Sequence, residues 1–113
     1  MSVSMETSLR DGILIVSVSG RVDAANADEF GAKLAELTGA SDIKRVILEC
    51  SKLAYVSSAG LRVLLKTVKS LRQHNGSLSL CAANPNVQEV LRIAGFTSFL
   101  TVYASVEEAV KGT

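Results

Sequence analysis

Apolar and polar residues follow two different periods along the chain, and these predict strands and helices in turn. A nearly continuous apolar run over 13–19 and a shorter one over 45–50 are typical of strands covered on both faces. Residues 4–9 form another predicted strand, and Asp11-Gly12 supplies the positive φ angles of a tight hairpin. Gly20 is expected to end the second strand of this hairpin.

Helical spacing of apolar residues predicts two long helices. The first covers about 25–37, and Asn26 and Glu29 stand at its start in capping-box spacing. The second has its apolar stripe over about 61–71 and is expected to end at Gly76, which can take a left-handed cap. Both helices are amphipathic, so each is expected to lay one side on a sheet.

The C-terminal part predicts shorter elements. Residues 77–81 and 99–103 are expected to be strands, and between them Asn84-Pro85 opens a helix that Gly95 ends. A last short helix is expected over 106–110. Two strands followed by repeated helix and strand require right-handed crossovers, which lay helices against a sheet. We therefore predict an α/β fold with a mixed β-sheet of about five strands packed with about four helices.

Length and composition fit one ordinary globular domain, so we assign residues 1–113 to a single domain. The chain is 48% hydrophobic and 20% charged, with 12 Lys and Arg against 11 Asp and Glu and a net charge of +1. This balance lacks the excess of basic residues that is typical of a protein with a nucleic-acid partner. Because the chain lacks a signal-peptide pattern and a run of about 18 apolar residues, we expect a cytoplasmic protein without direct membrane insertion.

Cys50 and Cys81 are expected to be buried apolar residues. Each ends an apolar run, and neither has a CxxC or Cys-His companion. The sequence therefore indicates no metal site and no cofactor. A disulfide between the two runs is geometrically conceivable, but the absence of a secretory signal argues against it.

The stretch over 53–61, LAYVSSAGL, is the most informative part of the chain. An apolar run stops at Ser57 and Ser58 and restarts as an amphipathic helix, so two hydroxyls lie at a helix N-terminus. Unpaired backbone N–H groups and a partial positive charge stabilise an anion there, including a phosphate built on one hydroxyl. The alternative is that one serine simply caps the helix, and spacing alone leaves both interpretations open.

A hydrolase with Ser58 as nucleophile is the enzymatic alternative. The strand-to-helix elbow of such enzymes needs glycine two residues before the serine, where Val56 stands, and no aspartate follows Asp42. The single histidine, His74, lies sixteen residues along the same predicted helix, roughly 24 Å from Ser58. Neither glycine-rich phosphate loop pattern is present. We therefore expect no catalytic residues and no enzymatic activity.

Two segments resemble a known family. YVSSAGLRVLL over 55–65 resembles the signature of the STAS domain, as found in bacterial anti-sigma factor antagonists. GRVD over 20–23 resembles that family's glycine-x-hydrophobic-aspartate loop. The resemblance implies a partner-switching phosphoprotein that binds an anti-sigma factor, a serine kinase of the GHKL type, while unphosphorylated. Phosphorylation would break the complex, and a PP2C-type phosphatase would restore the binding form.

The resemblance also implies which residues act. The phosphorylated serine falls on Ser58, with Ser57 as the alternative, the loop aspartate on Asp23 and the turn glycine on Gly60. Together with Arg62 as a rim contact, these residues form the expected partner-binding set. Many family members carry an aspartate directly before the phosphorylated serine, where this chain has Ser57.

Several alternatives stay open at this point. Asp23 could serve only to cap the following helix or to form hydrogen bonds within its loop. Gly60 either lets a partner approach closely or relieves crowding in the first helical turn. The rival function is a STAS-like regulatory subunit of a lipid or anion transport complex, and the oligomeric state is open between a monomer and a weak dimer.

Overall fold

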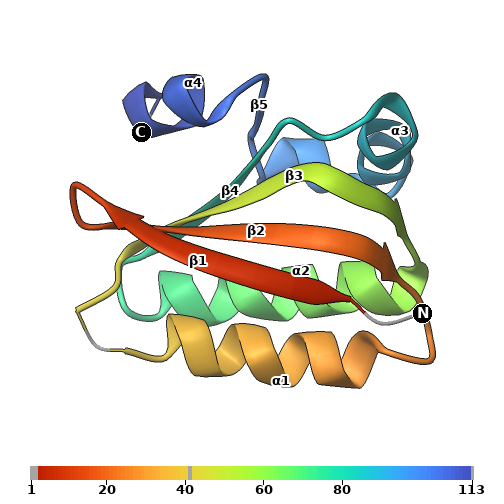
Figure 1. Ribbon diagram of the computed structural model, residues 1–113, viewed down its shortest axis with the longest axis horizontal. Helices are drawn as coiled ribbons and strands as arrows, with labels where there is room; N and C mark the ends of the chain where they lie inside the picture. Colours follow the sequence, from red (N-terminus) through yellow and green to blue (C-terminus); the bar gives the residue numbers. More distant parts are fainter. Residues whose placement is uncertain (1–2, 41, 113) are drawn as a thin grey trace.

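The computed structural model describes residues 3–40 and 42–112, which form a five-stranded mixed sheet with helices on both faces (Figure 1). The strand order is β1-β2-β3-β4-β5, with β1 antiparallel to β2 and the other neighbours parallel. The predicted α/β fold class is confirmed. The elements are β1 (Ser4–Arg10), β2 (Ile13–Val22), α1 (Ala27–Thr38), β3 (Arg45–Val56), α2 (Ser58–Arg72), β4 (Ser77–Cys81), α3 (Pro85–Ile93), the 3₁₀ turn η1 (Phe96–Ser98), β5 (Val102–Tyr103) and α4 (Val106–Lys111).

The hairpin of β1 and β2 has the predicted turn, but β2 is longer than expected. Asp11 and Gly12 have φ angles of 54° and 80°, as a two-residue type I′ turn requires. Gly20 does not end the strand. Its φ of 101° lets the chain pass an irregularity in the pairing with β3, and β2 continues to Val22.

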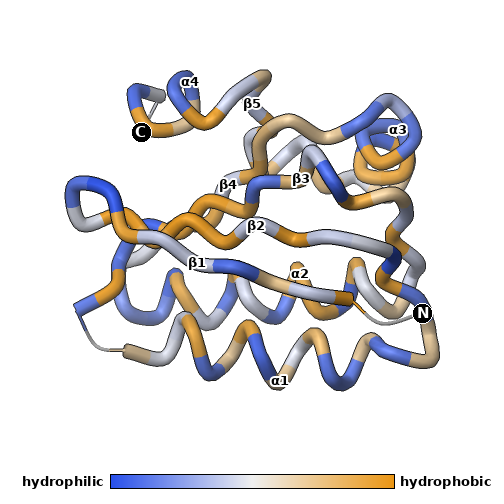
Figure 2. Tube along the Cα trace, in the orientation of Figure 1, coloured by the Kyte–Doolittle hydropathy of each residue, from blue (hydrophilic) through white to orange (hydrophobic). Residues whose placement is uncertain are grey.

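Burial on both faces explains the continuous apolar run of β2. In Figure 1, α1 and α2 lie side by side beneath the sheet and α4 lies above it, and Figure 2 shows the hydrophobic stretches along β2 and β3. Alternate β2 residues enter two cores. The main core beneath the sheet includes Val16, Val18, Phe30, Leu34, Leu48, Leu64 and Val68. The smaller core under α4 includes Ile13, Ile15, Ile47, Cys81 and Ala109.

The strand before the serine turn is also longer than predicted. β3 pairs with β2 as far as Val56, six positions beyond the expected end at Cys50. The helix that follows begins at Ser58, so the predicted placement of the two serines at a helix N-terminus is confirmed. The serine pair therefore joins a strand directly to a helix, with no intervening loop.

Two predicted helix ends are wrong in detail. The side chain of Asn26 does not cap α1 but bonds back into the preceding loop, so the proposed capping box with Glu29 is absent. After α2, the left-handed position is taken by Asn75, with a φ of 63°, and not by Gly76. Gly76 is required for space instead, because a Cβ there would lie 2.5 Å from the carbonyl oxygen of Lys44.

The last predicted strand is mostly replaced by other structure. Gly95 ends α3 as expected, with a φ of 82°, and the chain then forms η1, which places the Phe96 side chain in the main core. Only Val102 and Tyr103 pair with β4. The final helix and its cap are confirmed, since the Ser105 hydroxyl accepts a hydrogen bond from the Glu108 N–H at 3.2 Å.

The two cysteines are buried, as predicted, and free. They belong to different cores on the two faces of the sheet. Burial raises the pKa of Cys50 to about 12 and that of Cys81 to about 11. Within the described residues, no helix is both long enough and apolar enough to cross a bilayer.

Candidate functional site

The ends of β2 and β3 bring the two sequence motifs together. Val22 is the register partner of Val56, and the N–H of Ser57 donates to the Val22 carbonyl oxygen at 2.8 Å. Asp23 follows Val22 directly, so its loop lies beside the serine turn. Carboxyl ends of neighbouring parallel strands meet at one edge of a sheet, a common place for binding sites in α/β folds.

Ser57 is the N-cap of α2. Its backbone is extended, with φ −90° and ψ 174°, and its hydroxyl oxygen accepts a hydrogen bond from the Gly60 N–H at 3.3 Å. The residue is half-buried. The capping interpretation therefore applies to Ser57.

Ser58 has a different environment one residue later. It is the first residue of α2 and is exposed to solvent. Its hydroxyl makes no hydrogen bond to any residue within 3–40 or 42–112. The backbone N–H groups at the start of a helix lack intrahelical partners, so the Ser58 hydroxyl lies beside a locally positive helix end.

Gly60 is buried and is required by internal packing. A Cβ at this position would lie 2.7 Å from one methyl carbon of Val22 and 2.7 Å from one methyl carbon of Val56. Both valines are buried in the main core, so neither can move aside easily. The crowding that this glycine relieves is between the first turn of α2 and the strand ends.

The Asp23 loop is held by a reciprocal pair of side chains. One carboxylate oxygen of Asp23 accepts from the N–H groups of Ala25 and Asn26, at 3.0 and 3.2 Å. The Asn26 side chain accepts from the Asp23 N–H at 2.9 Å and donates to the Arg21 carbonyl oxygen at 2.8 Å. Asn26 is buried, and sequence reasoning missed its role. The signal for this role was that Asn26 stands three residues after Asp23. The capping-box prediction instead pairs Asn26 with Glu29, three residues later.

Two arginines give the rim of the site a positive charge. Arg62 is exposed and lies four residues after Ser58, on the same side of α2. The Arg21 guanidinium lies 4.5 Å from the centre of the Tyr55 ring, and both residues are exposed. Sequence reasoning did not single out Arg21, although it belongs to the GRVD segment. No acidic residue occupies the first turn of α2.

Among the described residues, no side chain forms a hydrogen bond with the Ser58 hydroxyl through which it could take the proton. His74 is exposed at the far end of α2, where its Nδ1 lies 3.0 Å from the Ser70 carbonyl oxygen. Among the residues that the structure describes, no three His, Cys, Asp or Glu side chains gather as metal ligands would. The chemistry available at this edge is that of an accessible hydroxyl.

Sequence comparison identifies the family. The STAS domain family matches residues 4–109. The Bordetella bronchiseptica protein named "Putative anti-sigma factor antagonist BtrV" is 46% identical over 99 residues, which cover 88% of this chain and 84% of that protein. This chain belongs to the anti-sigma factor antagonist family of STAS domains. The resemblance noted in the sequence is thus confirmed. Anti-sigma factor antagonists are non-enzymatic regulators, which agrees with the expectation of no enzymatic activity.

Solved structures show the same fold. An anti-sigma factor antagonist from Mycobacterium paratuberculosis has a TM-score of 0.87 at 21% identity, covering 97% of this chain and 92% of that one. The antagonist SpoIIAA in its unphosphorylated form has a TM-score of 0.80 at 19% identity, covering 97% and 98%. Its phosphorylated form, from Bacillus, has a TM-score of 0.72 at 17% identity, covering 96% and 97%. These similarities extend over almost the whole of each chain.

Proposed function

We propose that this STAS domain is a cytoplasmic partner-switching protein controlled by phosphorylation of Ser58. In the unphosphorylated form it binds an anti-sigma factor that is also a serine kinase of the GHKL ATPase type. Transfer of a phosphoryl group to Ser58 releases the complex, and a PP2C-type phosphatase removes the phosphate and restores binding. Asp23, Ser57, Ser58 and Arg62 line the docking surface, while Gly60 sets how closely the helix approaches the sheet.

The difference between the two serines carries this proposal. The Ser57 hydroxyl is half-buried and already accepts the Gly60 N–H, whereas the Ser58 hydroxyl is exposed and has no partner among the described residues. A kinase needs a hydroxyl that can enter its active site without breaking the substrate's own structure. These contacts favour Ser58 over Ser57 as the acceptor.

The location at a helix start explains why the fold would tolerate the phosphate. A phosphoserine adds about −1.5 to −2 charges, and a helix N-terminus stabilises negative charge. Arg62, one turn later on the same side, can approach the phosphate. The modification then changes the charge that a partner meets and leaves the packing of α2 unchanged.

A modest loss of binding free energy on phosphorylation is enough to dissociate a complex. If the desolvated docking surface loses about 3 kcal/mol, affinity falls on the order of 100-fold. The structures of SpoIIAA in unphosphorylated and phosphorylated forms support the proposal, because both resemble this chain over at least 96% of its length. A fold compatible with both states is what such a switch requires.

The proposal is tested by incubating the chain with ATP and a candidate anti-sigma kinase of the GHKL type, followed by intact-mass measurement. We expect a mass gain of one phosphate, no gain in Ser58→Ala, and an unchanged gain in the matched variant Ser57→Ala. Binding of the kinase should be lost on phosphorylation. Phosphate on Ser57, or equal binding by both forms, contradicts the proposal.

The same preparation separates the alternatives. Constant co-purification with transport subunits, without phosphorylation, would favour the transport-complex function. Labelling of Ser58 by a serine-reactive phosphonate would favour an enzyme instead.

A further inference from the structure

The two edges of the sheet are protected very differently. β5 forms one edge and has two residues, whereas β1 forms the other and has seven. Exposed strand edges pair readily with other strands, and proteins usually prevent this with short edge strands, prolines, bulges or inward-pointing charges. β5 is protected by its length. β1 contains no proline and pairs with β2 in one continuous register, so it has neither a break nor a bulge.

The hairpin turn determines which backbone groups of β1 point outward. A two-residue type I′ turn makes the flanking residues, Arg10 and Ile13, a hydrogen-bonded pair. Hydrogen bonding alternates along an antiparallel ladder, so the N–H and C=O groups of Met5, Thr7 and Leu9 face away from β2. Within the described residues these groups have no partner on that side. None of the three carries a charge.

The side chains of the same residues provide a projection and a hollow. Met5 and Leu9 lie opposite Val18 and Leu14, two main-core residues, and so point to the side of the sheet that α1 covers. Leu9 is 67% exposed, which is unusual for a strand leucine. Beside Met5 lies a hollow of about 330 Å³ between β1 and α1. It is lined by Val3, Met5, Glu29, Ala32, Lys33 and Glu36.

We propose that β1 is the interface between two copies of this chain, which pair antiparallel about a two-fold axis through Thr7. In this register Thr7 faces Thr7 of the second copy, and Met5 faces Leu9. The exposed Leu9 side chain of each copy then enters the hollow beside Met5 of the other copy. The two-fold axis therefore repeats this contact between leucine and hollow once on each side. Through the two β1 strands, the sheets of the two copies join into one continuous sheet.

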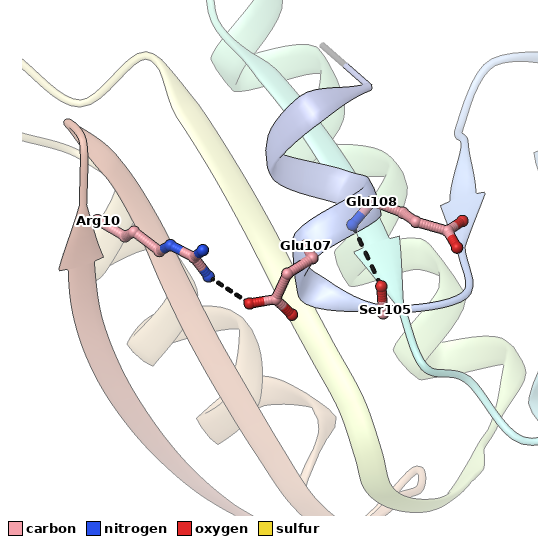
Figure 3. Close-up of polar contacts among 4 residues, drawn as sticks. All are labelled: Arg10, Ser105, Glu107 and Glu108. Atoms are coloured by element: carbon pink, nitrogen blue, oxygen red, sulfur yellow. Dashed lines mark hydrogen bonds and ion pairs between the residues drawn. The ribbon is translucent and has the colours of Figure 1, made fainter.

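Among two-fold registers, this one alone brings all three outward-facing residues opposite one another. Three residue pairs then exchange two backbone hydrogen bonds each. On the other side of the sheet, Glu6 faces Ser8 and Ser4 faces Arg10, so like charges do not meet. Figure 3 shows the Arg10 side chain reaching away to Glu107 of α4, with which it forms an ion pair at 2.9 Å. The charge of Arg10 is therefore neutralised beside its own α4.

The test measures the molecular mass of the full chain against concentration by sedimentation. We expect a monomer–dimer equilibrium that Thr7→Pro abolishes. Proline is tolerated at this position because the Thr7 N–H points away from β2, so the variant should keep its fold, as checked by circular dichroism.

Leu9→Lys should weaken the dimer about 100-fold, because two-fold symmetry doubles the loss of one buried leucine. The matched control is Ile93→Lys, which replaces another exposed apolar side chain, 71% exposed on α3, and should leave the dimer unchanged.

A cross-link tests the register itself. Thr7→Cys places two thiols across the axis and should oxidise readily to a disulfide-linked dimer, whereas Ser8→Cys should not, because Ser8 faces Glu6 in this register. The native cysteines are buried and do not compete. A monomer at every concentration, a dimer that resists Thr7→Pro and Leu9→Lys, or equal cross-linking by both cysteine variants overturns the proposal.

Discussion

The first turn of α2 has two sides with opposite requirements. On the inner side, Gly60 lies so close to Val22 and Val56 that a single added carbon would meet both at 2.7 Å. On the outer side, Ser58 and Arg62 are exposed, and the Ser58 hydroxyl has no partner among the described residues. One turn of helix thus combines a contact that permits no change with a surface that can accept a new charge. The rigid side is what would let the exposed side signal without moving the fold.

The largest effect should come from filling the inner side. We expect Gly60→Val to lower the free energy of unfolding by about 3 kcal/mol, since overpacking of a closed core contact forces both valines to shift. Urea denaturation followed by circular dichroism measures it. The matched control Ser58→Val places the same side chain on the outer side and should change stability by no more than about 0.5 kcal/mol. Equal stability of both variants would show that the two sides do not differ.

The same contrast extends to the neighbouring loop, where Asn26 is buried and Asp23 is half-buried. Asn26→Ala leaves the Asp23 N–H and the Arg21 carbonyl oxygen without their partner, which should cost about 2 kcal/mol. Asn86→Ala, at an exposed position on α3, is the control and should be nearly neutral. If Asn26→Ala is as stable as this control, the hydrogen bonds of the Asn26 side chain do not stabilise the loop.

Removing the cap should have a smaller effect. Ser57→Ala deletes the acceptor of the Gly60 N–H and should cost about 1 kcal/mol in unfolding free energy, with phosphorylation of Ser58 retained. Ser70→Ala, on an exposed part of the same helix, provides the comparison. If Ser57→Ala is as stable as wild type but is no longer phosphorylated, the roles assigned to the two serines are reversed.

The smallest effect on stability is expected at Ser58 itself. Ser58→Asp places a negative charge at a helix N-terminus, which should change the unfolding free energy by no more than about 0.5 kcal/mol. Kinase binding, measured by calorimetry, should nevertheless weaken. A variant that loses binding and stability together would indicate a folding defect instead of a switch.

Local patterns in the sequence predicted most of the fold. The apolar stripe of α2, the Asp11-Gly12 turn and the Asn84-Pro85 helix start depend on residues close together in the chain, and each is confirmed. The extension of β3 to Val56 and the shortness of β5 depend on distant partners. β3 is prolonged by pairing with the irregular end of β2, and β5 pairs with β4 only at Val102 and Tyr103.

The candidate site divides in the same way. The serine turn and the GRVD segment were visible as motifs, and the pairing of β2 with β3 brings them together at one edge of the sheet. The reason for Gly60 was not visible, because its contacts come from Val22, thirty-eight positions earlier, as well as from Val56. Asn26 was assigned to the wrong partner, since the same side chain could cap a helix or bond back into its loop.

Burial of the two thiols has a consequence for the chemistry of signalling. Peroxides and alkylating reagents attack the thiolate, and a pKa of about 12 leaves Cys50 almost entirely protonated at neutral pH. Cys81, with a pKa of about 11, is insulated in the same way and lies on the opposite face of the sheet. While the domain stays folded, Cys50 and Cys81 are therefore poorly reactive toward oxidants, and neither is suited to act as a redox sensor.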